Sequence, residues 1–390
     1  MTAKASGLRI AKRLDEVGFS DIVQIRNKVM ALRAAGEKVH MLHGGEPYFE
    51  TPEAIKYAAI QAMVDNQTHY ANSSGIAPLR EALAVKLTTK NNIPSTPDQV
   101  LVTVGGSQAL YGAFLSVLDP GDDALVFSPY WTPIADLIRG AQARPLLVPT
   151  STARRNGIGK TLAQFSTPST RCIYYNTPQN PSGVVFTEAE AKEVAAFALE
   201  RDLIVVADEA YEDLVYDGSH FSIASLPGMA ERTITCYTFS KTYAMTGWRG
   251  GYAQAPEPFM TALRKIVLYS TNGVSTPVQY AMLQALKTPD SEIEYRREEY
   301  RKRRALLLEG LNFCGLACEP PAGAFYAFPN VEKIHKNSRA AAEILLDKAH
   351  IATIPGSVFG AQGEGHLRFG YAISISEIEA CVAALKAFCG

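Results

Sequence analysis

Short apolar segments alternate with helix-length amphipathic segments between about residues 50 and 285. Five of the apolar segments have the length of buried strands and end in turn residues: 100–104, 124–128, 172–176, 203–209 and 233–239. Helical periodicity fills the intervals, for example over 107–118 and over 187–200, where Thr187 and Glu190 have the spacing of a capping box. This alternation predicts βαβ units, a mostly parallel sheet and therefore an α/β fold.

The pattern changes after Pro289. A long charged helix over 291–311 is followed by short strand and turn segments and by a final helix from Ser376. We therefore expect a large domain over 51–287 and a smaller α+β domain over 288–390, with 1–50 packing against the latter because chain ends often lie together. Acidic residues alternate with the basic ones in the charged helix, which favours a solvated helix face over a nucleic-acid stripe.

Composition narrows the class of protein. The 38 basic and 39 acidic residues of the 390-residue chain leave a net charge of -1, without the basic excess of a nucleic-acid binder. Its six cysteines are scattered and lack the paired ligands of a zinc site, so we expect reduced thiols and no metal. Neither a signal peptide nor a run of 18 apolar residues is present, which predicts a cytoplasmic protein with no membrane partner.

Candidate ligand-binding residues lie at or after the ends of all five predicted strands. In open α/β sheets the carboxyl ends of the strands are where ligands bind, so these residues can meet in one pocket. They are Gly105, Gly106 and Ser107 after the first strand, Trp131 after the second, Asn180 in the loop after the third, Asp208 at the end of the fourth, and Ser240, Lys241 and Arg249 after the fifth.

Each of these residues alone also fits an ordinary role, as a tight turn, a helix cap, a loop, a core tryptophan or a surface lysine. Together they suit a phosphorylated aromatic aldehyde. A desolvated lysine forms a Schiff base with an aldehyde. A helix that begins after two glycines, with Ser240 and Arg249 beside it, offers donors to a phosphate.

The order of three motifs is specific. Ser-Lys-x5-Gly-x-Arg spans 240–249, Asn-Pro-x-Gly spans 180–183 and Asp-x-x-Tyr spans 208–211. From about His40 to its end the chain resembles the class I/II, fold type I, aminotransferases that depend on pyridoxal 5′-phosphate (PLP), and among them the prokaryotic aspartate aminotransferase subgroup. The resemblance implies the fold type I architecture and PLP as the cofactor.

The resemblance also assigns roles to the cofactor contacts. It implies that Lys241 forms the internal aldimine and moves the substrate proton, and that Asp208 pairs with the pyridinium nitrogen. Tyr211 and Asn180 would bind the phenolic oxygen, and Trp131 would stack on the ring. The phosphate would lie on residues contributed by three segments: Gly105, Gly106, Ser107, Ser240 and Arg249.

Substrate and subunit contacts follow from the same resemblance. Arg368 would hold the substrate α-carboxylate, with Gly45 and Asn180 beside it, and Tyr70 would reach the phosphate of a neighbouring subunit, so the resemblance implies a homodimer. Ser107 departs from the subgroup, which has a lysine there that helps to bind a side-chain carboxylate. Aspartate specificity is therefore not implied.

Transamination between an L-amino acid and a 2-oxo acid is the leading hypothesis for function. A PLP-dependent lyase, cyclase, decarboxylase or oxidase would use the same cofactor contacts, so the sequence leaves that alternative open. A PLP-sensing regulatory module is disfavoured because only about forty residues, without a helix-turn-helix pattern, precede the matched region. A nicotinamide dehydrogenase is disfavoured because the glycine fingerprint of dinucleotide binding is missing.

Overall fold

A seven-stranded sheet forms the centre of the structure, a computed structural model that describes residues 10–18 and 21–390. Across the sheet the strands are β2 (Val100–Val104), β8 (Gly250–Gln254), β7 (Thr233–Thr238), β6 (Ile204–Asp208), β5 (Thr170–Asn176), β3 (Asp123–Ser128) and β4 (Arg144–Pro149). Only β8 runs antiparallel to its neighbours in this sheet. The predicted mostly parallel α/β fold is confirmed, and all five predicted strands belong to this one sheet.

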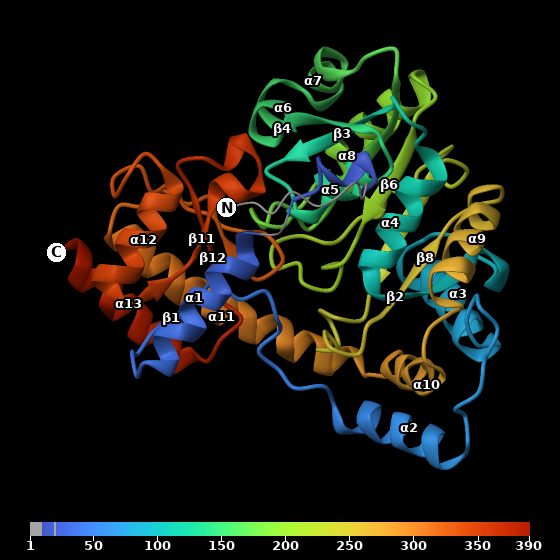
Figure 1. Cartoon of the computed structure of the whole chain (residues 1–390), viewed down its shortest axis with the longest axis horizontal. Helices are drawn as coiled ribbons and strands as arrows, with labels where there is room; N and C mark the ends of the chain where they lie inside the picture. The colour runs from blue at the N-terminus through green and yellow to red at the C-terminus, as the bar shows by residue number, and fades with distance from the viewer. Residues whose placement is uncertain (1–9, 19–20) are drawn as a thin grey trace.

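Helices cover both faces of the sheet (Figure 1). One face packs against α4 (Gly105–Val117), α5 (Pro133–Gly140) and α9 (Phe259–Thr271). The other face packs against α2 (Glu53–Val64), α3 (Ala77–Lys90), α6 (Thr150–Asn156), α7 (Ile158–Phe165), α8 (Glu188–Glu200) and α10 (Thr276–Ala285). Neighbouring residues of a strand therefore enter different cores: Tyr174 joins the first and Tyr175 the second.

Two helix starts show how local sequence sets the elements. The capping box before α8 is present, with Thr187 and Glu190 each accepting the backbone N–H of the other. Helix α4 begins at Gly105, earlier than the predicted start at Ser107 or Gln108. The side chain of Gln108 accepts the backbone N–H of Val104 at 2.7 Å, which satisfies a donor at the strand-to-helix turn and lets the helix begin directly after β2.

The C-terminal elements form a separate group with its own buried core. They are α11 (Asp290–Phe313), β9 (Tyr326–Ala327), α12 (Ser338–Ala349), β10 (Ile351–Ala352), β11 (Ile354–Pro355), β12 (Leu367–Gly370) and α13 (Ile375–Cys389). Strands β11, β12 and β9 form a small antiparallel sheet. Arg368 lies on β12, the middle strand of that sheet.

The N-terminal segment contacts both groups of elements. Strand β1 (His40–Met41) pairs in parallel with β10, and Val29 of α1 (Asp21–Ala34) packs with Leu346 and Ala352. A short 3-10 helix over Lys12–Leu14 contacts α5, on the side of the large sheet. The chain then runs from β1 through Gly45 towards α2, so Gly45 lies on the segment that joins the two groups.

Helix α11 corrects the expectation of a solvated charged face. Several of its charges do pair at i, i+3 and i, i+4, as expected, for example Arg303 with Glu299 at 2.8 Å. Arg296 and Arg303, however, are buried and lie over the rings of Phe49 and Tyr48. The helix runs from the C-terminal elements towards α10, so one side of it is interior rather than exposed (Figure 1). Aromatic residues more than 200 positions away in the sequence cover these two arginines, which the charge pattern of the helix alone does not reveal.

In the part of the chain that the structure describes, no helix is both long enough and apolar enough to cross a lipid bilayer.

Candidate active site

Asp208 lies at the carboxyl end of the buried strand β6, in the middle of the large sheet. The hydroxyl of Tyr174 donates to its Oδ2 at 2.7 Å, and the backbone N–H of Ala210 donates to Oδ1 at 3.2 Å. Burial raises the pKa of Asp208 to about 6, although both hydrogen bonds and the charge of Lys241 oppose that rise. The carboxylate is therefore ionised at neutral pH, in a place with few other polar groups.

Lys241 follows β7, the strand next to β6, and its side chain enters the same region. Its Nζ donates to the backbone carbonyl of Gly45 at 2.7 Å and lies 5.7 Å from the ring centroids of both Tyr211 and Phe325. Burial, with the charges of Arg368 and Arg249, lowers the pKa of Lys241 to about 8, while Glu46 and Asp208 oppose the shift. About a tenth of this amine is then uncharged at pH 7, far more than for a lysine with its ordinary pKa, and the uncharged form is the nucleophile.

Arg368 approaches the pocket from the small sheet and is buried. Its two terminal nitrogens donate to Asn180 Oδ1 and to the carbonyl of His43, both at 3.1 Å, and its guanidinium lies 4.4 Å above the ring of Tyr326. The Nε atom is buried, and no described residue forms a hydrogen bond with it. These contacts fix a planar cation, which suits a carboxylate.

Two glycines make room for these groups. A Cβ on Gly45 would lie 3.1 Å from the hydroxyl of Tyr326 and 3.9 Å from Nη2 of Arg368. Gly105, at the start of α4, has φ +69°, and a Cβ there would lie 2.6 Å from the guanidinium of Arg249. Arg249 itself adopts φ 56°, a conformation that costs a non-glycine residue on the order of 1 kcal/mol. Its guanidinium is thereby held against the first backbone groups of α4.

The other predicted residues lie as follows. Gly106 and Ser107 continue the first turn of α4, where Ser107 is exposed, and Ser240 accepts a hydrogen bond from Thr238 at 2.9 Å. Trp131 is half-buried beside the core that contains Tyr174. Tyr211 shares a 2.9 Å hydroxyl contact with Tyr326. Tyr70 is 92 % exposed and lies outside this constellation.

The structure adds residues that the sequence did not single out. Tyr174 and Tyr326 bring hydroxyls to Asp208 and Tyr211, and His43 supplies a carbonyl to Arg368. Strand alternation in the segment 172–176 places every second residue on one face, which is a signal for Tyr174. No comparable signal exists for Tyr326, because its contact with Tyr211 joins segments 115 positions apart.

Glu209, beside Asp208 in the sequence, belongs to a different buried network. It accepts hydrogen bonds from Ser222 and Tyr237 and pairs with His220 at 3.0 Å. Burial would raise the pKa of Glu209, but His220 and the two hydroxyls outweigh burial and lower it. Glu212 lies near this pair and is neutralised by Lys86. The two adjacent acids are thus distinct: Asp208 faces the pocket, and Glu209 is an internal ion-pair partner.

Comparison with known proteins agrees with this geometry. The family model for aminotransferases of class I and II matches residues 37–385. The chain belongs to this family. It is 39 % identical to a probable aspartate/prephenate aminotransferase of Thermus aquaticus, over 93 % of this chain and 94 % of the relative. It is 38 % identical to aromatic-amino-acid aminotransferase 2 of Thermococcus litoralis, over 95 % of this chain and 96 % of that one.

A solved structure, the aspartate aminotransferase of Thermus thermophilus with maleate, has a TM-score of 0.92 and 37 % identity, covering 97 % of this chain and 99 % of that one. The expected resemblance, the fold type I architecture and the expected class of activity are confirmed. The protein is a transferase that moves amino groups, close to the aspartate aminotransferase group. The lyase, cyclase, decarboxylase and oxidase alternatives are not favoured.

Proposed function

We propose that this aminotransferase uses PLP, held by Lys241, to move the amino group of an L-amino acid to a 2-oxo acid. One observation carries the proposal: a lysine with a lowered pKa, a buried carboxylate and a buried arginine come from the ends of β7 and β6 and from β12, and the charges of Arg368 and Asp208 both act on Lys241. The lysine suits the cofactor aldehyde, the carboxylate suits the pyridine nitrogen, and the arginine suits the α-carboxylate of a substrate.

The residues present fit PLP. Gly105 has no side chain, and a Cβ at this position would collide with the guanidinium of Arg249. The guanidinium therefore lies close to the backbone at the start of α4, and the two can bind the same phosphate. Ser240 and Ser107 offer hydroxyls, and Trp131 offers a flat apolar side chain. When bound, PLP supplies an aldehyde that condenses with amines and a protonated ring that accepts electrons.

The chain's own groups then have distinct tasks. Uncharged Lys241 Nζ would take the proton from the substrate Cα and deliver it to the C4′ carbon of the cofactor. Asp208, ionised above about pH 6, holds the proton of the ring nitrogen. Tyr211 and Asn180 would bind the phenolic oxygen of the cofactor, and Gly45 would leave space for the substrate carboxylate beside Arg368.

The donor and acceptor are identified by a single-turnover experiment. The relatives are named for aspartate, prephenate and aromatic amino acids, so the panel of L-amino acids includes aspartate, phenylalanine and tyrosine. The PLP-loaded protein is mixed with each amino acid without any oxo acid, and absorbance and products are followed. Conversion to the pyridoxamine form with release of the matching 2-oxo acid supports the proposal, whereas ammonia or carbon dioxide with retention of the PLP form contradicts it.

The lowered pKa of Lys241 predicts the pH dependence of cofactor uptake. Only the uncharged amine attacks an aldehyde, so the rate of PLP incorporation into the cofactor-free protein should rise about tenfold per pH unit below pH 8 and level off above it. Stopped-flow absorbance measures this rate. A rate that still rises about tenfold per unit between pH 8 and pH 10 would show that Lys241 keeps an ordinary pKa.

A homodimer accounts for a surface that otherwise faces solvent. Helix α2 exposes a cluster of large apolar side chains, which are between 49 % and 67 % exposed: Tyr57, Ile60, Met63 and Val64. Tyr70 follows this helix in the sequence. We propose that this face binds a second copy and that Tyr70 enters the partner's pocket. The domain boundaries and the cytoplasmic location expected from the sequence stay predictions.

Mixing two inactive variants tests the role of Tyr70. Lys241→Ala and Tyr70→Phe chains, dissociated together and reassociated, should regain about a quarter of wild-type activity, because half of the dimers are mixed and each holds one intact pocket. No recovery, with mixed dimers present by native mass spectrometry, would mean that Tyr70 serves its own subunit. Full activity of Tyr70→Phe by itself would mean that Tyr70 serves neither pocket.

A further inference from the structure

Tyr174 is the one hydroxyl bonded to the carboxylate of Asp208 among the described residues. Its donor–acceptor distance is 2.7 Å, and both side chains are buried. The two residues lie on neighbouring parallel strands and on the same face of the sheet: Tyr174 pairs with Val206, two positions before Asp208. The rigid ladder of β5 and β6 thus fixes the tyrosine beside the carboxylate.

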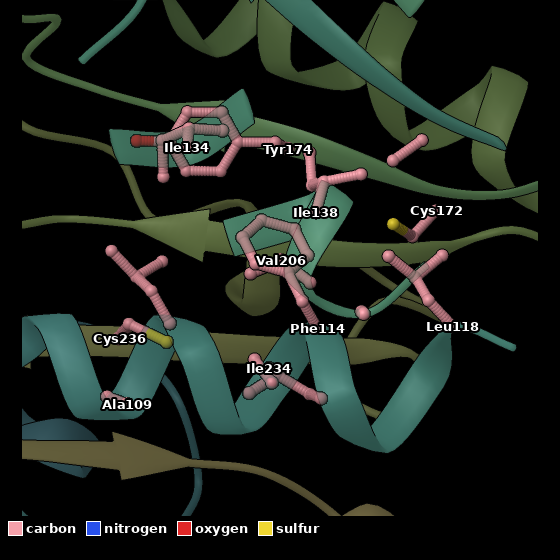
Figure 2. Packing of buried hydrophobic residues seen from close by; sticks show 14 of the residues in the cluster. Ala109, Phe114, Leu118, Ile134, Ile138, Cys172, Tyr174, Val206, Ile234 and Cys236 are labelled. Carbon is pink, nitrogen blue, oxygen red and sulfur yellow. The ribbon is translucent and has the colours of Figure 1, made fainter. Parts of the chain in front are cut away.

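The environment of this hydrogen bond is apolar. Figure 2 shows the ring of Tyr174 among Ile134, Phe114 and Val206, in the core between the sheet and helices α4 and α5. The ring centroids of Phe114 and Tyr174 are 6.1 Å apart. A carboxylate at the edge of such a core loses much of its hydration, and each donor that it retains has a large effect on its charge state.

Few other groups act on Asp208. The titratable and charged groups that face it are Tyr174 on β5, Cys236 on β7, Glu209 and Tyr211 on its own segment, and Lys241 after β7. Glu209 opposes ionisation, whereas Lys241 favours it from the pocket side. Apart from the N–H of Ala210, Tyr174 is the hydrogen-bond donor that holds the carboxylate from the side of the core.

We propose that Tyr174 is a positioning residue for the reaction: its hydroxyl fixes the orientation of the Asp208 carboxylate and keeps it ionised, so that Asp208 holds the proton of the cofactor ring. This inference rests on the proposed PLP-dependent function. Tyr174 acts through Asp208 and contacts neither substrate nor cofactor in the proposal. Without the hydroxyl, Oδ2 would have an apolar neighbour, and the carboxyl would take up a proton at a higher pH.

Tyr175 supplies a matched control. It is the next residue of β5 and is fully buried, but it points to the opposite face, where its ring packs 4.9 Å from Phe186. Its hydroxyl has no hydrogen-bond partner among the residues that the structure describes. Tyr174→Phe and Tyr175→Phe therefore remove the same atom from adjacent buried tyrosines, and only the first removes a contact of Asp208.

The experiment compares pH profiles of the two variants and the wild type as PLP-loaded proteins. In Tyr174→Phe the acidic limb of the kcat profile should move up by about one to two pH units, with KM for the amino acid within about twofold of wild type. The pH titration of cofactor absorbance should shift as well. Tyr175→Phe should match the wild type in both, and equal melting temperatures would exclude unfolding as the cause.

Other outcomes separate the positioning role of Tyr174 from the proposed PLP-dependent transamination. Coinciding profiles of Tyr174→Phe and Tyr175→Phe would overturn the role of Tyr174 while leaving transamination intact. If the wild type forms no pyridoxamine with any amino acid, the proposed function fails. The absorbance titration then still decides the inference: a shift confined to Tyr174→Phe supports it, and no shift overturns it.

Discussion

Replacing Lys241 with alanine is expected to remove the covalent attachment of PLP and to lower the rate of amino transfer by at least about three orders of magnitude. Two functions are lost together, because the same amine binds the aldehyde and moves the Cα proton. The fold should survive, since the hydrogen bond that Nζ forms within the described part of the chain is to the carbonyl of Gly45. The amine also carries a desolvation penalty, evident in its lowered pKa, that alanine does not.

The measurement combines absorbance, borohydride reduction and peptide mapping. In the wild type, reduction should fix the cofactor on the peptide that contains Lys241, and in Lys241→Ala no peptide should carry it. Lys192→Ala is a suitable control, because Lys192 is an exposed lysine that forms an i, i+4 ion pair with Glu188 on α8. A labelled peptide in Lys241→Ala, with the absorbance band retained, would place the cofactor on another lysine.

The positions of the pocket residues could be predicted because each strand end is encoded locally. An apolar segment fixes the strand, and a parallel sheet then brings its carboxyl end to the same edge as its neighbours. That argument singled out Asp208, Lys241 and Gly105, and the structure places them at or just after the ends of β6, β7 and β2, which belong to one sheet. Their identification needed no knowledge of which strands pair.

What the sequence did not reveal depends on contacts between distant segments. Strand β8, which the sequence did not predict, begins with Gly250 and Gly251, and a Cβ on Gly251 would lie 2.5 Å from the backbone of Gly105. Glycine is required there by close packing of a strand against the start of α4. Tyr326 likewise reaches Tyr211 and Arg368 only because the small sheet is placed against the end of β6.

Arg368 is expected to determine affinity for the substrate carboxylate. Two hydrogen bonds, to Asn180 and to the carbonyl of His43, and the ring of Tyr326 hold its guanidinium in one plane. Burial lowers its pKa, but an arginine stays charged in proteins, so a substrate carboxylate would meet a preorganised and poorly hydrated cation. Loss of one partner of a buried arginine–carboxylate pair costs about 2 to 4 kcal/mol of binding free energy, or roughly 30- to 700-fold in affinity.

Arg368→Ala should therefore raise KM for every amino acid about 30-fold or more. The KM of Arg368→Lys should lie between those of the wild type and Arg368→Ala, since lysine keeps the charge but lacks the planar guanidinium. A substrate analogue separates this effect from damage to the pocket. The amine that lacks the α-carboxylate should react with the PLP-loaded wild type and variant at nearly equal, slow rates, because neither can use the missing contact. If Arg368→Ala instead slows the amine as much as the amino acid, the arginine supports the pocket rather than the carboxylate, and the assignment is wrong.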